Sequence, residues 1–107
     1  MKWTFDSYLA YQLQGLSFIS GGKFTSMDVN RYFNTPTMSM RNRQVKLSKL
    51  YTEEFNTSGF WEWNSFNDRI HRHLKRVVKS AGGTRQKIRN KWVYSLSADG
   101  FIPGAEE

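Results

Sequence analysis

The chain has 107 residues, of which 38% are hydrophobic and 16% aromatic, so we expect one folded domain with an apolar core. It contains no cysteine, which excludes disulfides and thiolate metal sites. It also lacks an apolar run of the roughly 18–20 residues that a membrane span requires. Because its first residues do not resemble a secretory signal, we expect a cytoplasmic protein that does not contact a membrane.

The net charge of +7 is unevenly distributed along the sequence. Residues 69–91 carry nine cations and no acid, whereas residues 51–68 sum to −4 and residues 92–107 to −3. Solubility does not require such segregation, so the block predicts a surface that binds a polyanion such as nucleic acid. The nine cations are Arg69, Arg72, Lys75, Arg76, Lys79, Arg85, Lys87, Arg89 and Lys91.

The first helix is expected to begin after Thr4 or Asp6 as its N-cap and to run to about Leu16. Its apolar residues recur every three or four positions, and Gly15 weakens its end. A glycine loop follows, and residues 23–25 are expected to form either a short strand or an extended connector.

Two further helices are expected before residue 56. Thr25 and Asp28 form the pattern of a capping box, which predicts the start of a short second helix. Pro36 then marks a turn, because proline disfavours a helical conformation in the residue before it. The apolar spacing predicts a third helix over residues 38–55.

The clearest helix pattern covers residues 65–80. Ser65 and Asp68 are spaced as an N-cap and its acidic partner, so the helix is expected to begin there. Its apolar stripe is Phe66, Ile70, Leu74, Val77 and Val78, and its cations project away from that stripe.

A β-hairpin with a basic tip is expected over residues 84–96, because polar and apolar residues alternate there on both sides of a turn at residues 89–91. The chain is therefore expected to form a single domain over residues 1–97. Residues 98–107 are expected to be a flexible acidic tail.

The segment from residue 71 to residue 96 resembles the recognition helix and wing of small winged-helix repressors of the arsenic-repressor type. The resemblance is carried by His73-Leu74-Lys75-Arg76, by Ala81-Gly82 and by Trp92-Val93-Tyr94-Ser95-Leu96. It implies an α+β winged helix-turn-helix fold, with three to four helices and a C-terminal basic β-hairpin. It also implies a homodimer, formed through the aromatic first helix. Metal sensing does not carry over, because that chemistry relies largely on cysteines and histidines and this chain has no cysteine.

A second assignment of the helix-turn-helix remains open. Residues 24–51 contain a capped helix, a turn with proline and a basic helix, which is also the order of a helix-turn-helix. In that case the later helix would be an addition to the motif. The groove would then be entered by Arg41, Arg43, Lys46 and Lys49.

The resemblance places helix 65–80 in the major groove and the hairpin along the backbone. Near the start of the helix, Asn67, Arg69 and Arg72 are the candidates for base contacts, since arginine reads guanine and asparagine reads adenine. The expected phosphate contacts are Lys75, Arg76 and Lys79 on the helix and Arg85, Lys87, Arg89 and Lys91 on the hairpin. Arg89, at the hairpin tip, is also placed to enter a minor groove.

The sequence does not favour catalysis or a metal. It contains no nucleophile elbow, P-loop or zinc-protease motif, so we expect neither an enzyme nor a cofactor. His71 and His73 point about 200° apart on a helix and cannot share an ion. Trp61, Trp63 and Trp92 could stack on unpaired bases, although a role in the core is the stronger expectation.

These observations predict binding of double-stranded DNA by a transcriptional regulator or by a DNA accessory protein of a phage or mobile element. The alternatives are an RNA or single-strand binding protein, which quenching of exposed tryptophans by single strands would favour, and a small inhibitor that docks on an acidic host protein.

Overall fold

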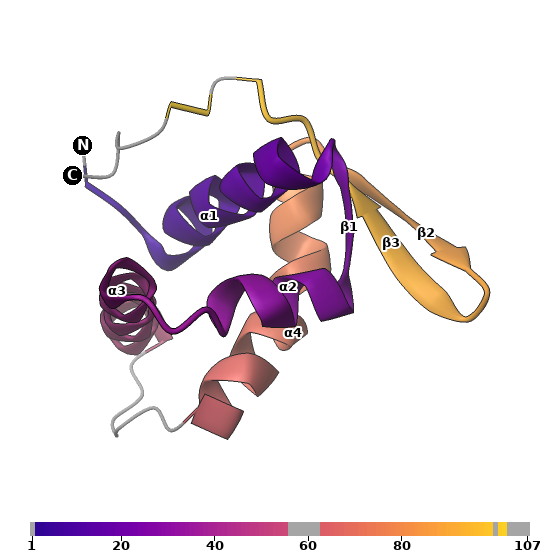
Figure 1. Cartoon of the computed structure of the whole chain (residues 1–107). Coiled ribbons are helices and arrows are strands. Elements are labelled where there is room, and N and C mark those ends of the chain that lie inside the picture. Colours follow the sequence, from indigo (N-terminus) through magenta and orange to yellow (C-terminus); the bar gives the residue numbers. More distant parts are fainter. Residues whose placement is uncertain (1, 56–62, 100, 103–107) are drawn as a thin grey trace.

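The computed structural model describes residues 2–55, 63–99 and 101–102, and of residues 63–67 the backbone alone. Its three strands form an antiparallel sheet in the order β1-β3-β2, and Figure 1 shows the last two strands projecting away from the helices. The described chain is therefore α+β, as expected. Its elements are α1 (Phe5–Ser20), β1 (Lys23–Thr25), α2 (Ser26–Phe33), α3 (Met38–Phe55), α4 (Trp63–Ser80), β2 (Thr84–Ile88) and β3 (Lys91–Ser95).

Helix α1 begins where the sequence indicates and ends later. Thr4 is the N-cap, and its hydroxyl accepts a hydrogen bond from the Ser7 amide at 3.1 Å. The expected end near Leu16 is wrong, because the helix continues to Ser20. Gly15 lies buried inside it, and a Cβ there would meet the Tyr32 hydroxyl at 3.1 Å and the Phe101 ring at 3.2 Å. This glycine permits close packing and does not end the helix.

Residues 23–25 form a strand that joins the C-terminal hairpin. Phe24 of β1 lies opposite Tyr94 of β3, and their rings stack with centroids 5.7 Å apart. Both side chains are buried. Because β1 lies between α1 and α2 in the chain, this pairing holds the hairpin against the helices.

Helices α2 and α3 match the expected segments. The Thr25 capping box is present, with the Asp28 carboxylate accepting from the Thr25 amide at 2.8 Å. Helix α3 covers residues 38–55 and buries Met40, Leu47 and Tyr51. Phe55, expected on the same side, keeps 38% of its surface exposed.

Helix α4 begins at Trp63, so the expected N-cap at Ser65 is wrong: that residue lies inside the helix. The apolar stripe is confirmed where side chains are described. Ile70, Leu74 and Val77 have no exposed surface and Val78 has 2%. Phe66 lies outside the described side chains.

A Schellman turn ends α4. The Gly82 amide donates to the Lys79 carbonyl at 3.1 Å and the Gly83 amide to the Val78 carbonyl at 2.9 Å. Gly82 has a φ of 85°, a conformation that glycine adopts without steric cost. A Cβ on Gly83 would lie 2.6 Å from the Ser95 carbonyl oxygen and 2.7 Å from Val78 Cγ1. The end of α4 can therefore pack directly on β3.

The hairpin turn is tighter than expected, with Arg89 and Asn90 alone between the strands. Their φ angles of 51° and 64° are both positive, as in the type I′ turn that matches the twist of two antiparallel strands. The pairing places Arg85 opposite Tyr94 and Lys87 opposite Trp92. These four residues share one face of the hairpin, on which Tyr94 is buried at the base whereas Lys87 and Trp92 are exposed.

The segment after the hairpin, expected to be a flexible tail, contacts α1 at two residues. The Tyr11 hydroxyl donates to the Ile102 carbonyl. The Phe101 ring packs between Tyr11, at 5.1 Å between centroids, and Phe18, at 5.6 Å. Residues 103–107 of the expected tail lie outside the described residues.

We expect Gly83→Ala to lower the free energy of unfolding by about 1–3 kcal/mol, because the added methyl group has to displace the β3 backbone. Urea unfolding monitored by circular dichroism would measure this change. Gly82→Asn is the matched control. No atom lies within 4 Å of a Cβ added at residue 82, and asparagine tolerates a positive φ, so the loss of unfolding free energy should be smaller. Equal stability of Gly83→Ala and the parent protein would contradict the close packing.

Candidate nucleic-acid interface

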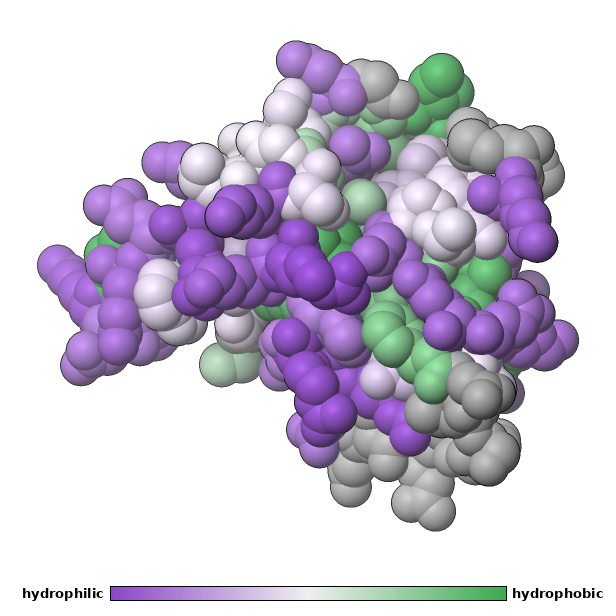
Figure 2. Space-filling view, turned by 180° about the vertical axis from the view of Figure 1, so that it is seen from behind, coloured by the Kyte–Doolittle hydropathy of each residue, from purple (hydrophilic) through white to green (hydrophobic). Residues whose placement is uncertain are grey.

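The exposed side of α4 is basic because its apolar stripe faces the core. Arg72, Lys75 and Lys79 are all exposed, and no residue from 69 to 80 is acidic. Figure 2, the view from behind, shows hydrophilic side chains running from the hairpin across the middle of the molecule. On this side of the molecule, hydrophilic side chains therefore extend without a break from the hairpin to the helical part.

The hairpin adds cations along its whole length. Lys87, Arg89 and Lys91 are exposed, and Arg85 is half-buried at the base. The guanidinium carbon of Arg85 lies 3.7 Å from the centroid of the Trp92 ring, and the Lys87 ammonium lies 5.7 Å from it. Stacking on the ring limits the orientations of the guanidinium and leaves its N–H groups available at the edges.

A cleft of about 180 Å³ lies where the last turns of α4 meet the start of β2. Lys75 and Lys79 line one side and Arg85 the other, with Val78, Gly83 and Thr84 completing the wall. Within the described part of the chain, these three cations have no carboxylate partner. Basic residues of the helix and of the hairpin thus meet at one cleft, although the wall itself is mostly apolar.

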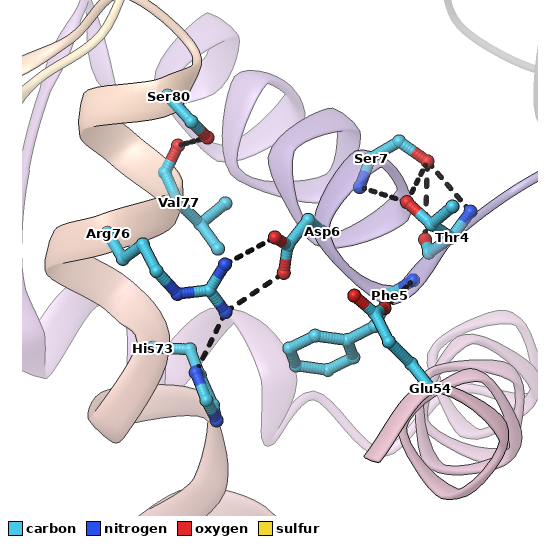
Figure 3. Close-up of polar contacts among 9 residues, drawn as sticks. All are labelled: Thr4, Phe5, Asp6, Ser7, Glu54, His73, Arg76, Val77 and Ser80. Carbon is cyan, nitrogen blue, oxygen red and sulfur yellow. Dashed lines mark hydrogen bonds and ion pairs between the residues drawn. The ribbon is translucent and has the colours of Figure 1, made fainter.

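Arg76 belongs to a different set of contacts. Its guanidinium forms a bidentate ion pair with Asp6 of α1, with one N–H···O distance of 3.0 Å, and donates to His73 Nδ1 at 2.9 Å (Figure 3). It therefore joins α4 to the first turn of α1. In the same region, the Glu54 carboxylate of α3 accepts from the Phe5 amide at 3.2 Å.

Both histidines of α4 have a lowered pKa. His73 lies against the rings of Phe5, Tyr51 and Phe55, and its Nε2 has no partner among the described residues. Burial is the main cause, and the positive charges of Arg76 and Arg72 lower the pKa further, against the opposing effect of Asp6 and Glu54.

Burial also lowers the pKa of His71, with a partly opposing effect of Asp68. The Nε2 atom of His71 is hydrogen bonded to Asn30 Oδ1, which links the side chains of α4 and α2.

The predicted site residues are only partly brought together. Of the nine cations in residues 69–91, Arg76 is paired with Asp6 and Arg69 has a further interaction, whereas the other seven lack a carboxylate partner within the described chain. The Arg69 guanidinium carbon lies 5.1 Å above the Tyr51 ring, and Asn67 lies outside the described side chains. We call the seven the basic face: Arg72, Lys75, Lys79, Arg85, Lys87, Arg89 and Lys91.

The second set of predicted cations, on α3, is less available. Arg41 and Lys49 are exposed, whereas Arg43 is half-buried and has a further interaction. The Lys46 ammonium lies 4.7 Å from the centroid of the Tyr8 ring and 5.8 Å from that of Trp3. Two of the four α3 cations are therefore already engaged within the fold.

Sequence reasoning missed the pairing of Asp6 with Arg76 and the cleft between helix and hairpin. The sequence pattern offers Asp6 as a cap of α1, and no local pattern relates it to Arg76, which lies 70 positions later. The pair Gly82-Gly83 was a usable signal for the cleft, since two consecutive glycines after a helix permit a close return of the chain.

In comparisons with known proteins, no family model, no curated protein and no solved structure matches this chain. No three metal-binding side chains gather in the described residues. Within the same part of the chain, no helix has the length and apolar character to cross a bilayer.

We expect the free energy of unfolding to decrease as the pH is lowered from 7.5 towards 5. His71 and His73 have folded-state pKa values below 6.5, so in this range the unfolded chain binds more protons than the folded protein. Their contribution to stability is fully present above pH 6.5 and is lost as the pH falls through the lowered values. Urea unfolding at several pH values would measure it. The variant His71→Gln/His73→Gln should show a flatter profile; an unchanged profile would refute the assignment.

Proposed function

We propose that the protein binds double-stranded DNA with α4 as its recognition helix and the β2–β3 hairpin as its wing. The observation that carries the proposal is the basic face: seven cations without carboxylate partners, on two elements that meet at one cleft. A polyanion that contacts both elements at once would neutralise this charge. The proposed role is that of a transcriptional regulator or of a DNA accessory protein of a phage or mobile element.

The order of elements is compatible with a winged-helix domain. Helices precede a C-terminal hairpin, and β1 joins that hairpin as the third strand. One hydrogen bond, between His71 and Asn30, links α4 to α2, and in this proposal these two helices form the helix pair of the motif. Helix α3 then lies between them in the chain as an additional element.

The charges of α4 and the hairpin favour this assignment over α3. All the cations of the basic face are on α4 and the hairpin, whereas α3 offers Arg41 and Lys49 as exposed cations outside internal contacts. Binding through phosphates releases counterions, with a salt slope of about −0.9 per contact. If five cations of the basic face touch phosphates, a plot of log affinity against log salt concentration should have a slope of about −4.5.

Within the basic face, Arg72 is proposed for base contact and the other cations for the backbone. Arg72 lies nearest the start of α4 among them, and arginine recognises guanine through two hydrogen bonds in the major groove. Arg76 is left out of the proposed interface, because its ion pair with Asp6 holds α1 against α4.

Fluorescence-anisotropy titration of labelled duplex DNA at 50 and 200 mM salt tests the proposal. We expect salt-dependent binding that Arg72→Ala/Lys75→Ala weakens by at least tenfold at 50 mM, since two charge-assisted contacts are lost. Arg41→Ala/Lys49→Ala removes two exposed cations from α3 and should have a much smaller effect. Circular dichroism should show both variants folded.

Three results would contradict the proposal. A larger loss in the α3 variant would move the recognition helix to α3. Stronger binding of single-stranded RNA than of duplex would favour a role for the exposed part of the Trp92 ring in stacking. No binding of either nucleic acid at 50 mM salt would leave the basic face as a docking surface for an acidic protein.

A further inference from the structure

The cleft between α4 and β2 is a concave part of the basic face, lined by residues from both elements. Lys75 and Lys79 are one helical turn apart and so lie on the same side of α4. Arg85 faces them from the first strand of the hairpin. A group inside the cleft is therefore approached by charges from two elements, whereas Lys87, Arg89 and Lys91 line no wall of this cleft.

The position of Arg85 is fixed more closely than that of an ordinary surface arginine. Its guanidinium stacks on the Trp92 ring at 3.7 Å, and Trp92 lies on the neighbouring strand, opposite Lys87. The entropy lost when a ligand orders the side chain is correspondingly smaller. The planar guanidinium also matches the geometry of two phosphate oxygens.

The end of α4 would repel an anion if its last carbonyl groups were unpaired, since they form the negative end of the helix dipole. Here the loop amides satisfy three of these carbonyl groups. The Ala81 amide donates to Val77, Gly82 to Lys79 and Gly83 to Val78, at 3.0, 3.1 and 2.9 Å. The cations of the cleft therefore face few competing acceptors.

We propose that this cleft binds one phosphate group between Lys75, Lys79 and Arg85, with Trp92 positioning the Arg85 guanidinium. The volume of about 180 Å³ is many times the roughly 10–15 Å³ of such space that one water molecule needs, so a phosphate group has room in the cleft. The inference rests on the proposed function, in which the phosphate belongs to the DNA backbone and fixes the angle of the wing on the duplex. A free phosphate compound has the same chemistry and is the other source to be tested.

The salt slope of duplex binding tests the site with single variants. Lys79→Ala and Arg85→Ala should each reduce the slope by about 0.9 and weaken binding about five- to tenfold at 0.1 M salt. The control is Lys23→Ala, an exposed cation on β1 at the opposite edge of the sheet, which should leave the slope unchanged. Urea unfolding would verify that all three variants remain folded.

Nuclear magnetic resonance locates the phosphate independently of the variants. On addition of duplex, the backbone amides of Gly83 and Thr84 and the Arg85 side-chain Nε–H should shift with saturation. A parallel titration with inorganic phosphate, against sodium chloride of equal ionic strength, tests a free phosphate.

The outcomes separate the two proposals. Duplex binding can depend on salt while Lys79→Ala and Arg85→Ala leave the salt slope unchanged and the Gly83 and Thr84 amides do not shift. That result would refute the phosphate site in the cleft and leave the DNA proposal standing. If the protein does not bind duplex, the DNA proposal fails. Saturable shifts with inorganic phosphate alone would then support the cleft as a site for a free phosphate compound, and their absence would overturn it.

Discussion

The packing of Gly83 against β3 determines how the helix and the hairpin are joined. The missing side chain lets the chain leave α4 within van der Waals distance of Val78 and of the Ser95 carbonyl oxygen. Because the Schellman turn and the β1–β3 pairing restrain the two sides of this contact, the hairpin cannot swing freely. The relation of Arg85 to Lys75 and Lys79 depends on this joint. Without it, the cations would be separate surface charges with little common effect.

The distribution of charge also depends on what the fold has already neutralised. Arg76 is paired with Asp6 and Lys46 lies over aromatic rings of α1, so these cations hold helices together. The seven cations of the basic face have no carboxylate partner in the described chain, although Arg85 and Lys87 lie over the Trp92 ring. A count of basic residues therefore overstates the charge available for a ligand. The contacts identify which side chains remain for that purpose.

Local patterns in the sequence predicted most elements and few of the contacts between them. The caps at Thr4 and Thr25, the stripe of α4 and the hairpin all depend on residues close together in the chain. Each is confirmed, the stripe from Ile70 onwards. The start of α4 was misplaced because Ser65 imitates a cap within a segment that is already helical. The Asp6–Arg76 pair and the cleft arise from packing between distant segments, which no local periodicity encodes. The cations of the candidate site were therefore predictable from the sequence. Which of them would pair with a carboxylate inside the fold was not.

The left-handed conformation of Arg89 shows that the hairpin tip is not optimised for stability. Type I′ turns favour asparagine followed by glycine, and a residue with a bulky side chain at positive φ costs about 1 kcal/mol or more. This chain places arginine at the first of these positions and asparagine at the second, with φ of 51° and 64°. A sequence selected for folding alone would replace Arg89 at the turn. Arg89 thus places a cation at the tip of the projecting hairpin at a cost in local stability.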